Sequence, residues 1–142
     1  MSVQLRTIKG YNSFSKIYQN GMKFRFMNMS AVVCFEEIES DCDGFIDKTK
    51  CIIYYGVTIG KKTAKKAVVR NRIKRLMRES LRITVKELEI RKLLPIQKII
   101  FSYFYAPKHL MQINLNDVLP AVKNLLEYAY LGYENINKKS NS

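Results

Sequence analysis

Cationic side chains crowd one stretch of this chain, and the chemistry they can perform is the binding of phosphate. Between Lys61 and Arg82 the sequence holds ten lysines and arginines against a single acid, Glu79. The whole chain has a formal net charge of +13, so this stretch carries most of the excess. Lysine and arginine neutralise phosphates and release the counterions that a polyanion condenses. The stretch therefore predicts a surface that binds a polyanion.

The spacing of these cations is that of a helix with one charged side. At 100° per residue, one charged row falls at intervals of four and a second row lies beside it. The first row is Lys66, Arg70, Lys74 and Arg78, and the second is Asn71, Arg75 and Arg82. The opposite side gathers Val69, Ile73, Leu76 and Ile83, with Ser80 among them. One side is thus predicted to pack on a core, and the other is left for a ligand.

A charged helix face is often simply solvated, which is the main alternative. A solvated face usually mixes signs, because Glu and Lys four residues apart stabilise a helix. Here like charges recur at that spacing, which costs stability, so we favour polyanion binding. Asn71 lies within this face, where its amide can hydrogen-bond a base edge or a backbone group. An Asn that only fills the helix surface fits the sequence equally well.

Motifs for catalysis or for metal binding are missing from the sequence. It has neither the G-x-x-x-x-G-K-[ST] pattern nor a nucleophile elbow, and His109, the sole histidine, stands in no motif. The three cysteines lack C-x-x-C spacing and are expected as free thiols: Cys34, Cys42 and Cys51. The acidic stretch 36–47 matches a calcium loop only in part, because a lysine replaces the bidentate glutamate at the last position. We predict no catalytic residue and no metal site in this chain.

Aromatic side chains could add a stacking surface for unpaired bases, worth about 1–3 kcal/mol per base. The chain has nine tyrosines and seven phenylalanines. The candidates for stacking are Phe14, Tyr18, Phe35, Tyr103 and Tyr105. Core packing is the competing interpretation for each of them, because aromatic rings dominate small cores.

Helix and strand patterns predict the elements that position these residues. A short helix begins near Asn12 or Ser13, which can cap it, and ends at Gly21. Strands are expected at 30–35, 51–59 and 99–105, with an extra strand near 24–27. The basic helix is expected from about 63 or 64 to 83, a short helix at 87–94, and a last helix at 117–130 that Asn116 would cap. The order α-β-β-β-α-β-α predicts an α+β fold, in which helices pack on a small mixed sheet.

Length and composition indicate one domain. The chain has 142 residues, of which 47% are hydrophobic, enough for a core. We expect a domain at 1–137 and a polar C-terminal tail at 138–142. No apolar run approaches the roughly 20 residues that cross a bilayer, and the first residues lack the apolar core of a secretion signal. We therefore expect a cytoplasmic protein without a membrane partner.

Two runs of sequence resemble the bacterial ribonuclease P protein component. One is Gly56-Val57-Thr58-Ile59-Gly60-Lys61-Lys62, and the other extends from Lys66 to Glu79. The signature of that family is a basic helix centred on Arg-Asn-Arg, here Arg70-Asn71-Arg72, after a strand and a Lys-Lys turn. Residues 12–21 also look like the first helix of that family and its closing glycine.

The resemblance implies a fold and a function that the residues alone do not give. The fold would contain a left-handed strand-helix-strand crossover, against the general rule. The family protein binds a large catalytic RNA and helps it to remove the 5′ leader from precursor tRNA. The chain would then be an accessory subunit of an endoribonuclease, with Mg²⁺ held by the catalytic RNA. The expected partners are that RNA and precursor tRNA, and not DNA.

The resemblance also assigns roles by position. The RNA-binding residues would be Lys61, Lys62, Lys66, Arg70, Asn71, Arg72, Lys74, Arg75, Arg78 and Arg82. A cleft between the first helix and the sheet would hold the single-stranded leader. Phe14 and Tyr18 match its helix positions, and Phe35 and Tyr103 are our candidates on the sheet.

Three other functions compete with this interpretation. A generic ribosomal or duplex-RNA module would show little preference for the leader. A protein that meets anionic lipid or an acidic partner would use the basic helix as a surface element. A protein-only nuclease would cleave precursor tRNA without added RNA.

Overall fold

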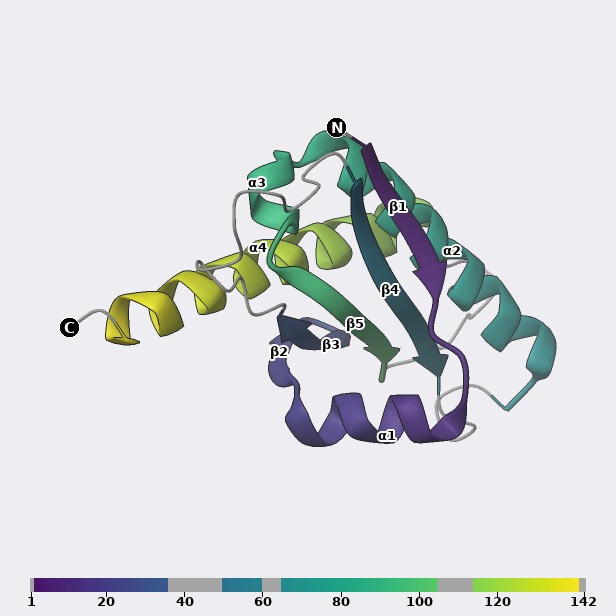
Figure 1. Ribbon diagram of the computed structural model, residues 1–142. Coiled ribbons are helices and arrows are strands. Elements are labelled where there is room, and N and C mark those ends of the chain that lie inside the picture. Colours follow the sequence, from purple (N-terminus) through teal and green to yellow (C-terminus); the bar gives the residue numbers. More distant parts are fainter. Residues whose placement is uncertain (1, 36–49, 60–64, 105–113, 141–142) are drawn as a thin grey trace.

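A computed structural model describes residues 2–35, 50–59, 65–104 and 114–140 of the chain. These residues form five strands and four helices (Figure 1). In chain order they are β1 (Ser2–Thr7), α1 (Tyr11–Asn20), β2 (Met22–Phe26), β3 (Met29–Phe35), β4 (Lys50–Ile59), α2 (Ala67–Glu87), α3 (Ile90–Leu93), β5 (Ile96–Tyr103) and α4 (Leu115–Ser140). The predicted α+β class is confirmed.

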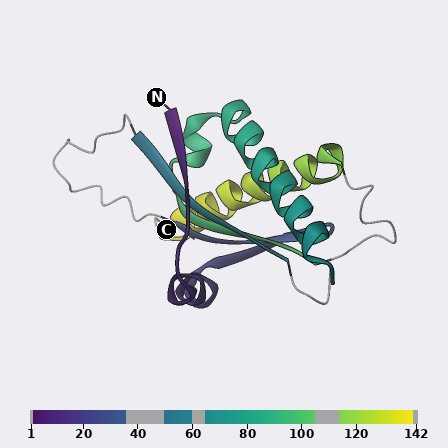
Figure 2. The same ribbon diagram turned by 90° about the vertical axis from the view of Figure 1, so that its right-hand side faces the viewer.

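All five strands belong to one mixed sheet with the order β1-β4-β5-β3-β2. β1, β4 and β5 are parallel, whereas β3 is antiparallel to both β5 and β2. α1 lies on one face of the sheet, and α2 and α4 lie on the other (Figure 2). The larger core is on the α2–α4 face, and a small cluster of Ile17, Val32 and Ile100 holds α1 in place.

The connection from β4 to β5 is left-handed, as the resemblance implied. The two strands are parallel neighbours, and the chain between them forms α2 and α3. α2 lies behind the sheet in the view of Figure 1, on the face opposite α1, as the turned view of Figure 2 makes plain. With the strands pointing down, β5 lies to the left of β4 (Figure 1), which gives the less common hand.

α2 packs on this core through a face of small and aliphatic side chains. Val69, Ile73, Met77 and Leu81 are buried, as are the two hydroxyl residues Ser80 and Thr84. Each hydroxyl donates a hydrogen bond of 2.7 Å to the carbonyl four residues earlier, so burial leaves neither donor unsatisfied. The buried face is therefore centred on Met77 and Leu81. Leu76 and Ile83, which the sequence placed in it, are half-buried at its margin.

Several element boundaries differ from the sequence expectation. β1 was not predicted, because six residues with four polar side chains give a weak strand pattern. α2 begins and ends about four residues later than expected. α4 begins at Leu115, where the Asp117 carboxylate accepts a hydrogen bond of 2.8 Å from the Asn114 N–H. It then continues through Pro120 to Ser140, so the boundary expected after residue 137 falls inside this helix.

Candidate RNA-binding surfaces

The outward side of α2 carries more cations than acids, and its two exposed acids are Glu79 and Glu87. Its exposed residues at helical spacing are Asn71, Arg75, Arg78, Arg82 and Lys86, which we call the α2 cationic row. Arg70, Arg72 and Lys74 are half-buried at the margins of the row, and Lys65 and Lys66 are exposed just before the helix. The predicted row through Asn71 and Arg75 thus faces outward together with Arg78, whereas Arg70 and Lys74 lie at its margin.

Carboxylates of the described residues leave most of this surface uncompensated. Arg82 lies 3.5 Å from Glu79, with both side chains more than half exposed, so that ion pair contributes little. Within the described ranges, no ion pair joins Lys74, Arg75 or Arg78 to an acid. The first turn of α2 contains no acid, so the positive end of its dipole adds to the charge. Arg70 donates a hydrogen bond of 2.9 Å to the Lys65 carbonyl, which fixes the entry into the helix.

Some predicted residues lie outside the described residues. Lys61 and Lys62 of the turn before α2 are among them, as are the acidic stretch 36–47, Cys42, His109 and Tyr105. Cys34 is a free, half-buried thiol whose pKa is raised by burial, against the opposing effect of nearby Lys98. In the part of the chain that the structure describes, no group of His, Cys, Asp and Glu is arranged to hold a metal ion. In the same part, no helix combines the length and apolar character needed to span a bilayer.

The opposite face of the sheet presents α1 and its aromatic side chains. The ring of half-buried Phe14 packs directly over Gly56 of β4, so closely that a Cβ at Gly56 would come within 2.7 Å of the ring. Ile17 is buried against Val32 and Ile100. Gly56 is therefore required for α1 to approach the sheet, and Phe14 serves first as a packing residue.

Tyr18 of α1 is accessible to solvent, with 38% of its surface exposed. Its hydroxyl lies 3.4 Å from Ser102 Oγ, which in turn lies 2.8 Å from Thr58 Oγ1. These hydroxyls form a small polar floor beside an accessible ring, suited to an unpaired base and its sugar. Ser102 and Thr58 were not among the predicted site residues. Their alternation with Ile100 and Gly56 along two strands was the available signal.

Phe35 and Tyr103 do not share this surface, which corrects their assignment to a cleft beside the first helix. Phe35 contacts Tyr133 of α4, with ring centroids 5.3 Å apart. Tyr103 is buried in the larger core, where desolvation raises its hydroxyl pKa and a hydrogen bond with Asn28 opposes that shift. Both side chains point to the α4 face, because side chains alternate along a strand and their neighbours Cys34 and Ser102 face α1.

Comparison with known proteins places the chain in a family. The family model described as Ribonuclease P matches residues 4–130. The ribonuclease P protein component of Microcystis aeruginosa is 28% identical over 85 residues, which are 60% of this chain and 64% of that protein. The chain thus aligns with slightly less than two thirds of this curated relative.

Solved structures of similar fold lead to the same family. The ribonuclease P protein of Staphylococcus aureus superposes with a TM-score of 0.59 at 21% identity, covering 87% of this chain and 94% of that one. The ribonuclease P protein of Thermotoga maritima gives a TM-score of 0.60 at 16% identity, covering 87% and 96%. The fold is shared with both, and the family model covers most of the sequence. The chain belongs to the ribonuclease P protein family.

Proposed function

We propose that this chain is the protein subunit of ribonuclease P, which binds a catalytic RNA and assists removal of the 5′ leader from precursor tRNA. The observation that carries the proposal is the α2 cationic row, with Arg75 and Arg78 unpaired by any described carboxylate. In a member of this family, the phosphates of a large RNA would neutralise these cations.

The role of the protein in this proposal is electrostatic. A catalytic RNA and its tRNA substrate are both polyanions, and they repel one another across their contact. Cations on α2 lower that repulsion and reduce the free energy needed to bring the two RNAs together. The Mg²⁺ ions of the reaction would be held by the RNA and supply the chemistry of phosphodiester hydrolysis. The protein would then matter most where Mg²⁺ is scarce.

The α1 side of the sheet would receive the single-stranded leader. Tyr18 offers a ring face, and Ser102 and Thr58 offer hydroxyls next to it. Stacking is tolerant of sequence, because every base has a π-face. That tolerance suits a leader, whose sequence differs from one precursor to the next.

Reconstitution tests the proposal. The purified chain is added to a bacterial ribonuclease P RNA at low Mg²⁺, and release of the leader from precursor tRNA is followed. We expect cleavage at the mature 5′ end that needs both components. Cleavage by the chain without RNA would identify a protein-only nuclease, and binding without any gain in cleavage would identify a generic RNA-binding module. Either result would contradict the proposal.

A further inference from the structure

A hollow beside β1 is lined by cations that do not belong to the α2 cationic row. It has a volume of about 810 Å³ and opens on the α1 side of the β1 edge of the sheet. Three of its lining residues are cations, Arg6, Lys9 and Lys98, and two more are Tyr54 and Ser13. No lining residue among those described is acidic. Three cations gathered without a carboxylate repel one another, unless an anion occupies the hollow.

Strand register explains how these residues meet. Arg6 of β1 pairs with Tyr54 of β4, and Tyr54 pairs with Lys98 of β5. Residues paired across parallel strands project from the same face, so the three side chains form one row. Two strand spacings separate Arg6 from Lys98, about 9–10 Å between Cα atoms. A half-buried tyrosine ring thus lies between two cations, an arrangement that can stack a base and bind the phosphates on either side of it.

Nearby groups among the described residues leave this charge uncompensated. Cys34 is the next residue of the row after Lys98 and a candidate counter-charge as thiolate. Burial raises the pKa of that thiol more than Lys98 lowers it, so Cys34 is neutral at physiological pH. Within the described residues, Arg6, Lys9 and Lys98 take part in no ion pair.

The hollow lies across β1 from a second hollow on the α2 side of the molecule. Leu5 of β1 lines both hollows, and the second has a volume of about 520 Å³. That second hollow includes Arg82 and Lys86 of the α2 cationic row. By contrast, α1 separates the first hollow from Tyr18, because Phe14 and Ile17 cover the middle of the sheet face. An RNA that binds α2 can therefore pass around the β1 edge without crossing α1.

We infer that the hollow lined by Arg6, Tyr54 and Lys98 binds an unpaired nucleotide of the same RNA that occupies the α2 cationic row. A duplex is excluded as the occupant, because its bases are stacked on one another and present no free face to Tyr54. The inference rests on the proposed function, since it extends the contact with the catalytic RNA beyond α2 and around β1.

Variants of the full-length chain test this inference by equilibrium binding to a ribonuclease P RNA. Tyr54→Leu removes the ring and should weaken binding roughly 5- to 150-fold, whereas Tyr54→Phe should bind like the wild type. The double variant Arg6→Gln/Lys98→Gln should weaken binding and flatten the plot of log K against log salt by about 1.4–1.8. Lys123→Gln removes one exposed cation of α4 and is the matched control. It should leave both the RNA affinity and its salt dependence unchanged. Circular dichroism confirms that each variant is folded.

The outcomes separate this inference from the proposed function. If the wild-type chain does not bind the RNA, the proposed function fails. If the wild type binds and the Tyr54 and Arg6/Lys98 variants bind equally well, only the present inference fails. It also fails if the assembled variants keep their RNA affinity but lose the preference for leader-bearing over mature tRNA, because the hollow would then bind the leader.

Discussion

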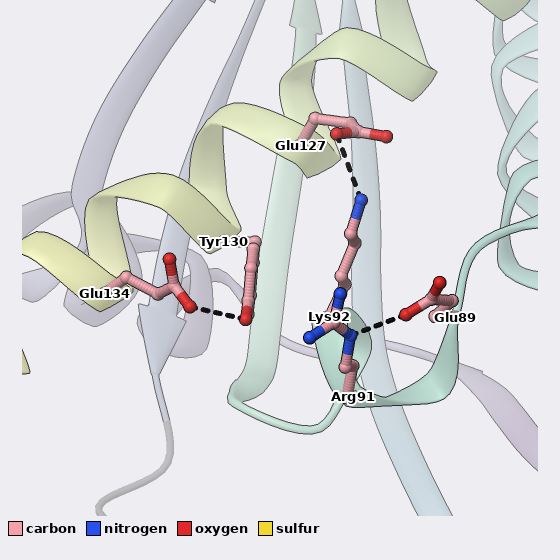
Figure 3. Close-up of polar contacts among 6 residues, drawn as sticks. All are labelled: Glu89, Arg91, Lys92, Glu127, Tyr130 and Glu134. Carbon is pink, nitrogen blue, oxygen red and sulfur yellow. Dashed lines mark hydrogen bonds and ion pairs between the residues drawn. The ribbon is translucent and has the colours of Figure 1, made fainter.

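Two charged regions of this molecule use their charges in opposite ways. In the corner where α3 meets α4, opposite charges are paired: Arg91 with Glu89, and Lys92 with Glu127 at 3.4 Å (Figure 3). The Tyr130 hydroxyl there donates a hydrogen bond of 2.6 Å to Glu134, which raises the pKa of Tyr130. On α2, the cations stand in a row, and Glu79 is the only acid between Lys61 and Arg82.

The difference shows which charges serve the fold and which remain for a ligand. Lys92 and Glu127 keep only 23% and 35% of their side-chain surface exposed, so they join α3 to α4. Arg75 and Arg78 are exposed and form no ion pair within the described residues. Removing charge should therefore reduce stability in the corner and reduce RNA binding on α2.

The largest effect is expected when two charges are removed from each region in turn. Arg75→Ala/Arg78→Ala should weaken binding to ribonuclease P RNA on the order of 10- to 100-fold. It should also reduce the salt dependence of log K by about 1.4–1.8, because two phosphate contacts are lost. Arg91→Ala/Lys92→Ala removes the same charge from the corner and should change the affinity less than twofold. Filter binding at several salt concentrations measures both, and equal losses for the two variants would remove the distinction between the regions.

Aromatic side chains permit the same comparison. Tyr18 on α1 and Tyr128 on α4 are each 38% exposed. Tyr18→Ala should weaken binding of leader-bearing tRNA by the assembled enzyme about 5- to 150-fold, with little effect on mature tRNA. Tyr128→Ala should leave the two substrates unchanged relative to the wild type. Phe14→Ala should also weaken leader binding, and because its ring packs on Gly56, the melting temperature should fall as well.

A carboxylate placed on α2 would make that helix resemble the corner. Asn71→Glu puts an acid four residues before Arg75, which should stabilise the helix by about 0.3–0.5 kcal/mol. The same change should weaken RNA binding about tenfold, because the acid neutralises Arg75 and repels phosphate. Thermal melting and titration with RNA measure the two effects. Asn71→Gln is the neutral control, and an Asn71→Glu variant that bound RNA with wild-type affinity would contradict the account.

The smallest effect is expected within the corner itself. Glu127→Gln removes the carboxylate that Lys92 contacts and leaves that ammonium partly buried. We expect a loss of about 1 kcal/mol in the free energy of unfolding, with RNA affinity unchanged. Urea denaturation gives the first quantity. A variant of undiminished stability would show that the Lys92–Glu127 pair does not hold α3 to α4.

The sequence predicted the α2 surface better than the α1 surface, for a physical reason. A helix places its side chains by a local period, so Arg75 and Val69 could be assigned to opposite sides from the sequence alone. The face of a strand residue depends on which helices cover the sheet, which is a tertiary property. Phe35 and Tyr103 were therefore placed on the wrong face.

The residues that line the hollow beside β1 were even harder to predict from the sequence. Arg6, Tyr54 and Lys98 are far apart in sequence and meet only through the register of three strands. β1 itself was not predicted, so its partner strands could not be identified. Close contacts between a helix and a sheet are equally difficult to predict from the sequence. The contact of Phe14 with Gly56 follows from the position of α1, and no sequence pattern near Phe14 or Gly56 indicates it.

Protection of lysines from acetylation, measured by mass spectrometry with and without ribonuclease P RNA, tests the central claim most directly. It compares lysines of α2 and of α4 in one protein without substitutions, in a single experiment. We predict that Lys86 of the α2 cationic row and Lys66 just before α2 become protected when RNA binds, while Lys123 on α4 reacts as fast as before. Protection of Lys123, with Lys66 and Lys86 still reactive, would contradict the account.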